Sequence, residues 1–225
     1  HMAEVGDEHL DIIREVVAFD PQEGAESYLG SVGRPARNSD QSFWGTGLSS
    51  LLSSARLTPG TAEGGPIGGG WWWHTPEDTR DKVDMDVLVE ETKLYVALAA
   101  RICESPVLPH DYTATVDDIK TVLDGLDSGT ISFDPLYNDL AVLRTELTSA
   151  YDAVATGAET DHQLAAAFED LQVELGNLLI PAVYMTRQEY EHEPKGPHRL
   201  LEELQPVATS TEQGQRFAGI SCQRG

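Results

Sequence analysis

The 225-residue sequence is poor in cysteine and in long hydrophobic runs, and each shortage excludes a class of protein. Its two cysteines, Cys103 and Cys222, are too few for a disulfide framework or a cysteine-based zinc site. No run of about 18 apolar residues occurs, so no membrane-spanning helix is expected. No secretory signal is visible. His1-Met2 is typical of a cloning remnant, which would make Ala3 the first natural residue of an expressed segment.

Basic residues are scarce as well. The chain has 15 Lys and Arg against 38 Asp and Glu, and its formal net charge is −23. Nucleic acids and anionic membranes are therefore poor partners. The acidic residues are dispersed and Lys is rare, which is typical of proteins adapted to high salt, where self-repulsion is screened. We expect a protein from a salt-adapted organism, cytoplasmic or exported, whose thermal stability rises from dilute buffer to multimolar salt.

Strand-like segments are few. A strand is predicted at Leu48–Leu57, a short one at Ser27–Val32, and a strand end where the tryptophans begin after residue 70. Helical periodicity is much stronger, at Glu8–Phe19 and at Asp84–Glu104. The segments 20–38 and 58–70 are rich in Gly and Pro and are typical of loops.

The sequence changes character after a proline-containing linker at 105–114. Apolar residues at spacings of three and four predict helices over 116–126, 136–154 and 164–178, the last ending at Pro181. Three amphipathic helices with short connections predict an antiparallel bundle. Its aromatic residues either fill the bundle or anchor an interface: Phe133, Tyr137, Tyr151 and Phe168.

The most unusual stretch is Gly68–Lys82, GGGWWWHTPEDTRDK. Three tryptophans precede His74, so their rings could shield the imidazole from water. Asp78 follows closely and could accept a hydrogen bond from a ring N–H. Two interpretations are open at this point: a metal-binding histidine with a supporting carboxylate, or a packed aromatic corner, since a single histidine does not define a metal site.

Two motifs also carry a resemblance. The stretch W-W-H-T-x-x-D-T followed by D-K, together with the earlier block SDQSFWGTGL at 39–48, resembles the zinc aminopeptidase family. That family includes bacterial aminopeptidases, glutamate carboxypeptidase, glutaminyl cyclases and the transferrin receptor ectodomain. The resemblance covers roughly residues 8–104. It departs from the family at Gln41, where the family often has His.

The resemblance implies a fold and a set of residue roles. The expected fold is α+β and mostly helical: the C-terminal part of a truncated α/β zinc-peptidase domain at 1–105, an antiparallel helical bundle at 106–207 and a polar tail at 208–225. In the family, two zinc ions are held by a His-x-Asp pair, a Glu, an Asp and a final His. His74 matches that final ligand, and Asp78 and Asp40 match supporting positions.

The other family ligands have no counterpart. His9-Leu10-Asp11 has the spacing of the pair but lies on a predicted amphipathic helix, and Glu90-Glu91 follows His74 in the wrong order. No catalytic residue is assigned, and this chain alone is expected to bind zinc weakly or not at all and to be inactive.

The stretch Pro181–His198 is also rich in polar and aromatic residues. It is either a surface loop packed on the bundle or a loop that reaches over an active site. For the second case we assign Trp73, Tyr190 and His192 to a substrate pocket.

Three functions remain in competition. The first is the C-terminal segment of a di-zinc exopeptidase, of aminopeptidase or carboxypeptidase type, acting on peptide ends. The second is a non-catalytic interaction protein similar to the transferrin receptor ectodomain, forming a homodimer through the bundle. The third is an acyltransferase similar to glutaminyl cyclases, which the long helical region disfavours.

Overall fold

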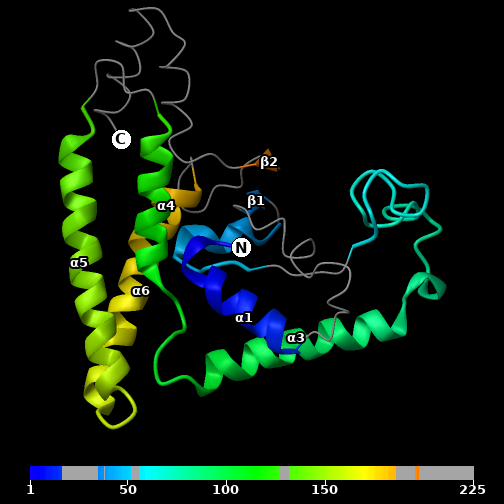
Figure 1. Ribbon diagram of the computed structural model, residues 1–225. Coiled ribbons are helices and arrows are strands. Elements are labelled where there is room, and N and C mark those ends of the chain that lie inside the picture. Colours follow the sequence, from blue (N-terminus) through cyan, green and yellow to red (C-terminus); the bar gives the residue numbers. More distant parts are fainter. Residues whose placement is uncertain (17–34, 38, 52–55, 127–131, 186–195, 198–225) are drawn as a thin grey trace, which may run out of the picture. The chain divides into compact units, whose positions relative to one another are not determined.

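The fold is described from a computed structural model, over residues 1–16, 35–37, 39–51, 56–126, 132–185 and 196–197 (Figure 1). This part contains five α-helices: α1 (Gly6–Val16), α3 (Met85–Glu104), α4 (Tyr112–Asp124), α5 (Asp134–Gly157) and α6 (His162–Tyr184). It also contains the short 3-10 helices η1 (Ala3–Val5), η3 (Ser39–Thr46) and η4 (Arg80–Lys82). The only strand pairing within these ranges is antiparallel and two residues long, between β1 (Ala36–Arg37) and β2 (Gly196–Pro197).

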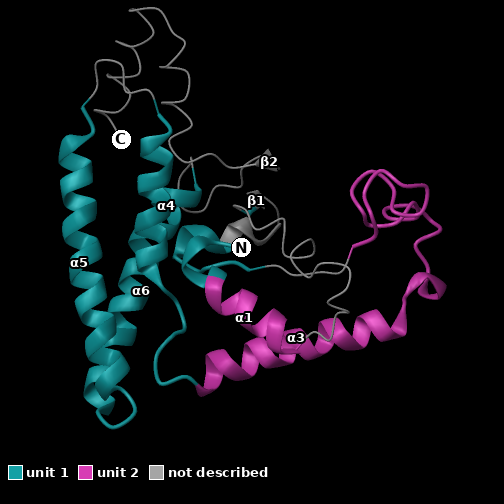
Figure 2. Ribbon diagram, in the orientation of Figure 1, with its two compact units in different colours: residues 1–6, 32–51, 105–225 teal, residues 7–31, 52–104 magenta. Residues whose placement is uncertain are grey.

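The chain divides into two compact units (Figure 2). Unit 1 comprises residues 1–6, 32–51 and 105–225, and unit 2 comprises residues 7–31 and 52–104. The sequence predicted a boundary at 105/106. The second unit 2 segment ends at residue 104, but residues 1–6 and 32–51 belong with the helices that follow the linker.

Unit 1 is built on the helices α4, α5 and α6, which pack against one another as consecutive antiparallel neighbours (Figure 1). Their starts follow from local chemistry. The Asp111 carboxylate accepts a hydrogen bond from Thr113 N at 2.8 Å at the start of α4, and the Asp161 carboxylate accepts from Gln163 N at 3.0 Å at the start of α6. Pro135 stands in the first turn of α5, where no backbone donor is needed.

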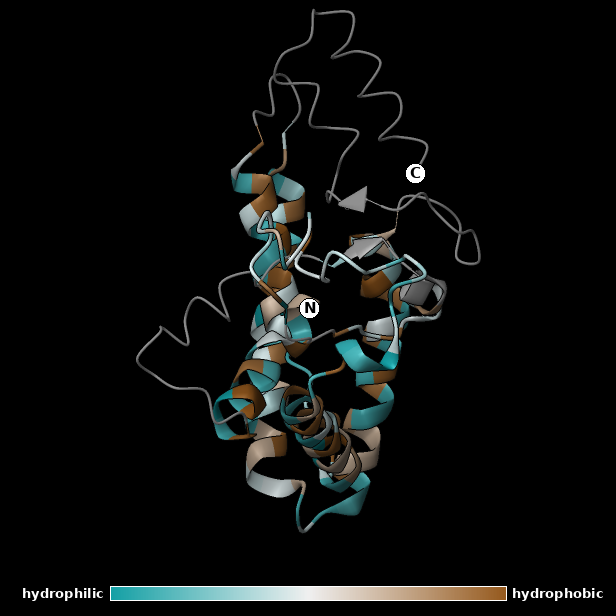
Figure 3. Ribbon diagram, turned by 90° about the vertical axis from the view of Figure 1, so that its right-hand side faces the viewer, coloured by the Kyte–Doolittle hydropathy of each residue, from teal (hydrophilic) through white to brown (hydrophobic). Residues whose placement is uncertain are grey.

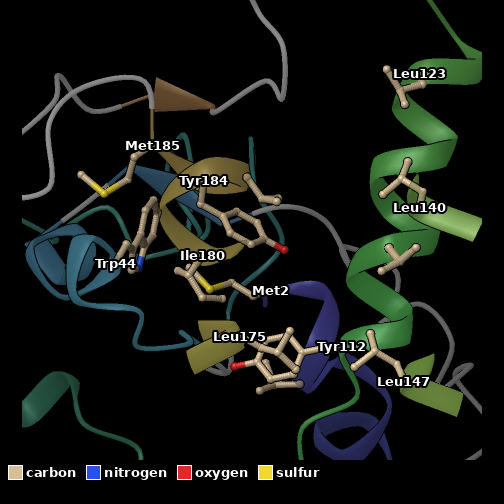
Figure 4. Close-up of a cluster of buried hydrophobic side chains, with 13 residues drawn as sticks. Met2, Trp44, Tyr112, Leu123, Leu140, Leu147, Leu175, Ile180, Tyr184 and Met185 are labelled. Carbon is tan, nitrogen blue, oxygen red and sulfur yellow. The ribbon is translucent and has the colours of Figure 1, made fainter. Parts of the chain in front are cut away.

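The core of unit 1 gathers residues that are far apart in sequence (Figure 4). Met2 and Trp44 are fully buried there, with Ile180 and Tyr184 at the end of α6. The Trp44 indole N–H donates to Ser50 Oγ at 2.7 Å, and its ring meets Tyr184 edge to face at 6.3 Å. The block at 39–48 therefore serves the helical core through Trp44.

A pair of glycines lets η3 approach α6. Gly47 has φ +79°, a left-handed conformation that favours glycine. A Cβ added to Gly176 would lie 2.6 Å from the Gly47 carbonyl oxygen and 3.0 Å from the Tyr112 hydroxyl. This contact requires the absence of a side chain at both positions.

Unit 2 has a different construction. It contains α1 from Asp7 onward, α3 and the glycine-rich segment between them. Arg101 of α3 forms ion pairs with Glu8 at 2.9 Å and Glu15 at 2.6 Å of α1. Its buried large apolar side chains, within the described residues, are Ile12, Leu94 and Leu98, and neither hydrophobic core cluster of the described chain includes a unit 2 residue.

The predicted α/β domain is wrong for the part of the chain that the structure describes. Of the predicted strand Leu48–Leu57, residues 48–51 and 56–57 are irregular, and 52–55 lie outside the described residues. Ser50 uses its carbonyl to accept from Met2 N at 3.1 Å, so this backbone pairs with the N-terminal segment and not with a sheet. The tryptophans form turns, and Ser27–Val32 lies outside the described ranges.

The helix predictions hold where they can be compared. The predicted helices at 84–104, 116–126, 136–154 and 164–178 correspond to α3, α4, α5 and α6. The predicted end at Pro181 is wrong, because α6 continues to Tyr184. Proline removes one backbone hydrogen bond, but Ile180, Val183 and Tyr184 are at most 1% exposed, so burial of the last turn offsets that loss.

Candidate functional site: the tryptophan–histidine turn

A compact loop holds the start of the candidate site in unit 2. Five backbone hydrogen bonds of 2.8–3.1 Å close the segment 57–71 on itself, among them Leu57 N to Gly68 O and Trp71 N to Glu63 O. Gly68 has φ +80° and Gly70 has φ +91°, and a Cβ on Gly70 would overlap the Trp72 ring. Glycine is therefore needed at position 70 for the close approach to the Trp72 ring, and at position 68 for the close approach to the Leu57 carbonyl.

Two hydrogen-bonded turns then fix His74 and the residues after it. The Trp72 carbonyl accepts from both Thr75 N at 2.9 Å and Thr75 Oγ1 at 2.6 Å. The Thr75 carbonyl accepts from Asp78 N at 3.1 Å, which makes Thr75–Asp78 a β-turn with Pro76 at its second position. Within this turn the Thr75 hydroxyl also accepts from Glu77 N at 3.2 Å.

His74 has an unusual backbone. Its φ is +61°, and it is the only non-glycine residue with a positive φ in the described part of the chain. A left-handed conformation costs an L-residue about 1–2 kcal/mol, so the surrounding turns must hold it. The imidazole stacks on the Trp73 ring at 3.7 Å between centroids and 24° between planes.

The imidazole is open to solvent. His74 is exposed, and Trp71 and Trp73 keep 52% and 40% of their surface accessible. The prediction that the tryptophans shield the ring from water is therefore wrong. Trp73 stacks on one face of the His74 imidazole. The glycine loop and the Thr75 turn fix the position of the His74 backbone.

The other predicted site residues fall in different places. Asp78 is exposed, and across residues 56–104 no hydrogen bond joins it to the His74 ring. Asp40 lies in η3, with its side chain outside what the structure describes, and Trp73 lies beside His74. Tyr190 and His192 lie outside the described residues.

The donor set does not make a complete zinc site. A zinc ion needs three or four protein ligands, and no group of three or more His, Cys, Asp or Glu side chains suited to a metal occurs among the residues that could be searched. The described residues therefore do not fit the two zinc ions that the resemblance implies. His74 can offer one ligand only.

The charges that follow the turn are mutually paired. The Asp81 carboxylate accepts hydrogen bonds from the Lys82 ammonium and, at 2.5 Å, from the Thr79 hydroxyl. These donors, Lys82 first, lower the pKa of Asp81 to about 2. Asp81 is therefore ionised at neutral pH, and its hydrogen bonds stay within η4 and the residue before it.

Unit 1 also contains a buried polar cluster that no sequence motif indicates. Glu4 of η1 is 2% exposed, and its Oε2 accepts from the Thr115 hydroxyl of α4 at 3.0 Å. Burial raises the pKa of Glu4, against the opposing effect of hydrogen bonds from Ser49 and Thr115, and Asp118 raises it further. The sequence gives no sign of this site, because the environment of Glu4 is created by the packing of η1 on α4.

The same unit holds a tyrosine pair, in which Tyr112 is buried and Tyr151 is half-buried. The Tyr151 hydroxyl donates to the His110 carbonyl at 2.6 Å and accepts from Tyr112 N at 2.9 Å. Burial raises the pKa of Tyr151 to about 12 and raises that of Tyr112 as well. Gln172, with no exposed surface, donates from Nε2 to the Leu108 and His110 carbonyls at 2.8 and 3.1 Å.

These contacts tie the linker before α4 to the bundle. Tyr151 and Phe168, which the sequence offered either as interface anchors or as bundle filling, meet edge to face at 5.0 Å, and Phe168 is 5% exposed. For these two residues the structure shows the bundle-filling arrangement. Burial also lowers the pKa of His110, so that ring is neutral at physiological pH.

Comparisons with known proteins add no relative: no family model, no curated protein and no solved structure matches this chain. None of the described helices is long and apolar enough to cross a membrane.

Proposed function

We propose that this chain is the C-terminal segment of a di-zinc exopeptidase and that His74 is its one contribution to the metal centre. The two motifs at 39–48 and 71–79 support the family. The single observation that carries the role of His74 is its strained, left-handed backbone in a turn held by hydrogen bonds. Strained backbone conformations of this kind cluster at active sites and ligand-binding sites.

The rest of the site would come from residues outside the described part. Neither the central sheet of such a peptidase nor its other ligands occurs among the described residues. Zinc is accordingly a cofactor of the parent protein, and the peptide substrate is a partner of that protein. The chain alone is expected to release no product from an aminoacyl chromogenic substrate.

A matched pair of histidine variants tests this proposal in the complete reading frame that contains the chain. His74→Ala should lower hydrolysis of aminoacyl-4-nitroanilides by at least about 100-fold. Mutating a residue that only hydrogen-bonds to a metal ligand already lowers metal affinity or activity about 10–100-fold, and loss of the ligand itself should cost more. Bound zinc, measured by mass spectrometry, should fall in parallel. His162→Ala, an exposed histidine at the start of α6, should change neither.

Two results would contradict the proposal. One is full activity and zinc content in the His74→Ala protein. The other is zinc-dependent hydrolysis by the 225-residue chain alone, at a rate above that of its own His74→Ala variant. That result would show that this chain contains the remaining zinc ligands.

A second candidate is a non-catalytic interaction protein that forms a homodimer through the bundle. It is favoured by the exposed apolar side chains on α5 and α6, where Val142 is 62% and Leu178 is 64% exposed. A complete reading frame with neither zinc nor hydrolysis, combined with a dimer that Val142→Glu dissociates, would establish this alternative.

A further inference from the structure

Helix α3 carries a second apolar surface on the side away from its ion pairs. Leu94, Leu98 and Arg101 share one side of the helix at spacings of four and three, and Arg101 marks that side as the one facing α1. The other side presents large apolar residues to solvent, which together define the α3 face: Met85, Leu88, Val89, Tyr95, Val96 and Ile102. Figure 3 shows hydrophobic residues on more than one side of this helix, which is seen nearly end-on.

The α3 face contains no charge. Between its large residues lie positions 92, 99, 100 and 103, occupied by Thr, Ala, Ala and Cys, all exposed. The charged residues of α3, such as Asp86, Lys93 and Glu104, lie along its flank. An uncharged surface about 30 Å long is unexpected on a chain of net charge −23, and exposed apolar patches of this kind mark interaction sites.

Its spacing points to a helical partner. Met85, Leu88, Thr92, Tyr95, Ala99 and Ile102 follow one another at intervals of three, four, three, four and three residues. This is the seven-residue repeat with which two helices pack along a shared seam. Val89, Val96 and Cys103 form a further row at intervals of seven.

The same seam is complementary to itself. In an antiparallel pair centred between residues 92 and 95, Leu88 faces Ala99 of the second copy. Tyr95 likewise faces Thr92 of the second copy, so large side chains meet small ones at these central positions, and Met85 faces Ile102 at each end of the pair. None of the six seam residues is charged, so no two charges oppose each other within the seam.

The area agrees with a weak but specific dimer. A helix of 20 residues and about 10–12 Å diameter offers about 500 Å² along such a face. Two copies bury about 1,000 Å², which is the lower bound for a specific interface. We propose that a second copy of this chain occupies the α3 face and that the protein forms an antiparallel helix–helix dimer there.

Two valine variants with equal exposure test the proposal on the full chain. Val96 on the α3 face and Val142 on α5 are each 62% exposed, so Val96→Glu and Val142→Glu make the same chemical change on an equally accessible helix surface. Sedimentation velocity with reductant present should give a dimer for the wild-type chain and for Val142→Glu. Val96→Glu should weaken dimerisation at least about tenfold.

Salt provides an independent readout. The dimer fraction should increase from dilute buffer to multimolar NaCl, because repulsion between the acidic chains is screened while the apolar contact is not weakened. A monomeric wild-type chain at high salt overturns the proposal, as does a dimer unaffected by Val96→Glu. Dissociation by Val142→Glu alone also overturns it and places the interface on the bundle.

Misfolding of the charged variant has its own control. If far-UV circular dichroism shows that Val96→Glu has lost helix, Val96→Ser replaces it, since serine removes the apolar branch without adding a charge. It should still weaken the dimer several-fold, and an unchanged dimer in a folded Val96→Ser chain would contradict the α3 interface.

Discussion

Unit 1 and unit 2 differ in how far their large apolar side chains are buried. Both hydrophobic core clusters of the described chain lie in unit 1, whereas most of its exposed large apolar residues lie in the smaller unit 2. Unit 1 therefore has the interior of a self-supporting helical domain. Unit 2 has a hydrogen-bonded loop, a strained histidine and an exposed apolar helix face, which are features of an interaction surface.

Two tryptophans give the largest expected contrast between the units. Trp44→Ala should lower the free energy of unfolding by about 3–5 kcal/mol, because it removes a fully buried ring and leaves a cavity. Trp71→Ala removes the same ring from a site that is 52% exposed and should cost less than about 1 kcal/mol. Denaturant unfolding of both variants measures the difference, and equal losses would show that the burial contrast is not real.

Two glycines sharpen the description of unit 1. Gly176→Ala adds a Cβ that would meet the Gly47 carbonyl oxygen at 2.6 Å, so it should destabilise by about 1–3 kcal/mol although alanine favours helices. Gly125→Ala, at the end of α4, meets its nearest atom at 3.5 Å with φ −83° and should be close to neutral. Chemical denaturation midpoints compare the pair. A stabilising Gly176→Ala would mean that η3 does not pack against α6 there.

Glu4 gives a smaller, pH-dependent effect. Because its pKa is raised in the folded state, its contribution to stability is complete below the pKa of the unfolded chain and is lost as the pH rises through the folded value. Glu4→Gln stays neutral, so it should be more stable than the wild type near pH 8, by on the order of 1 kcal/mol, and similar to it near pH 4.

The control for this experiment is Glu146→Gln on the exposed surface of α5. Its stability difference from the wild type should vary little across the same pH range, because an exposed carboxylate gains little from neutralisation. Parallel pH profiles for the two variants would contradict the burial of Glu4.

The sequence predicts the helices of this chain much better than its remaining structure. The periodicity of α3, α4, α5 and α6 is strong because apolar spacing alone requires one buried side. The strand at Leu48–Leu57 was mistaken because a short apolar run does not reveal whether a neighbouring strand exists. Ser50 instead pairs with the N-terminal segment, a contact between residues 48 positions apart that no local pattern shows.

The metal-binding role of His74 stays a prediction. The motif singled out His74 and its glycine loop, and the structure adds the left-handed backbone of His74. The shielding by tryptophans was wrong, because aromatic residues close in sequence to a histidine can support one face of its ring while remaining exposed. The buried Glu4 was missed, since its environment is created by helix packing and not by its neighbours in sequence.

The contrast between the units is tested most directly by native-state hydrogen exchange in dilute solution. If unit 1 holds its own core and unit 2 does not, amides around Leu147 and Leu175 should exchange only through global unfolding. Amides around Leu94 and Leu98 of α3 should exchange at least about 100-fold faster through local opening. Equal protection in α3, α5 and α6 would contradict the account, because unit 2 would then unfold only together with the core of unit 1.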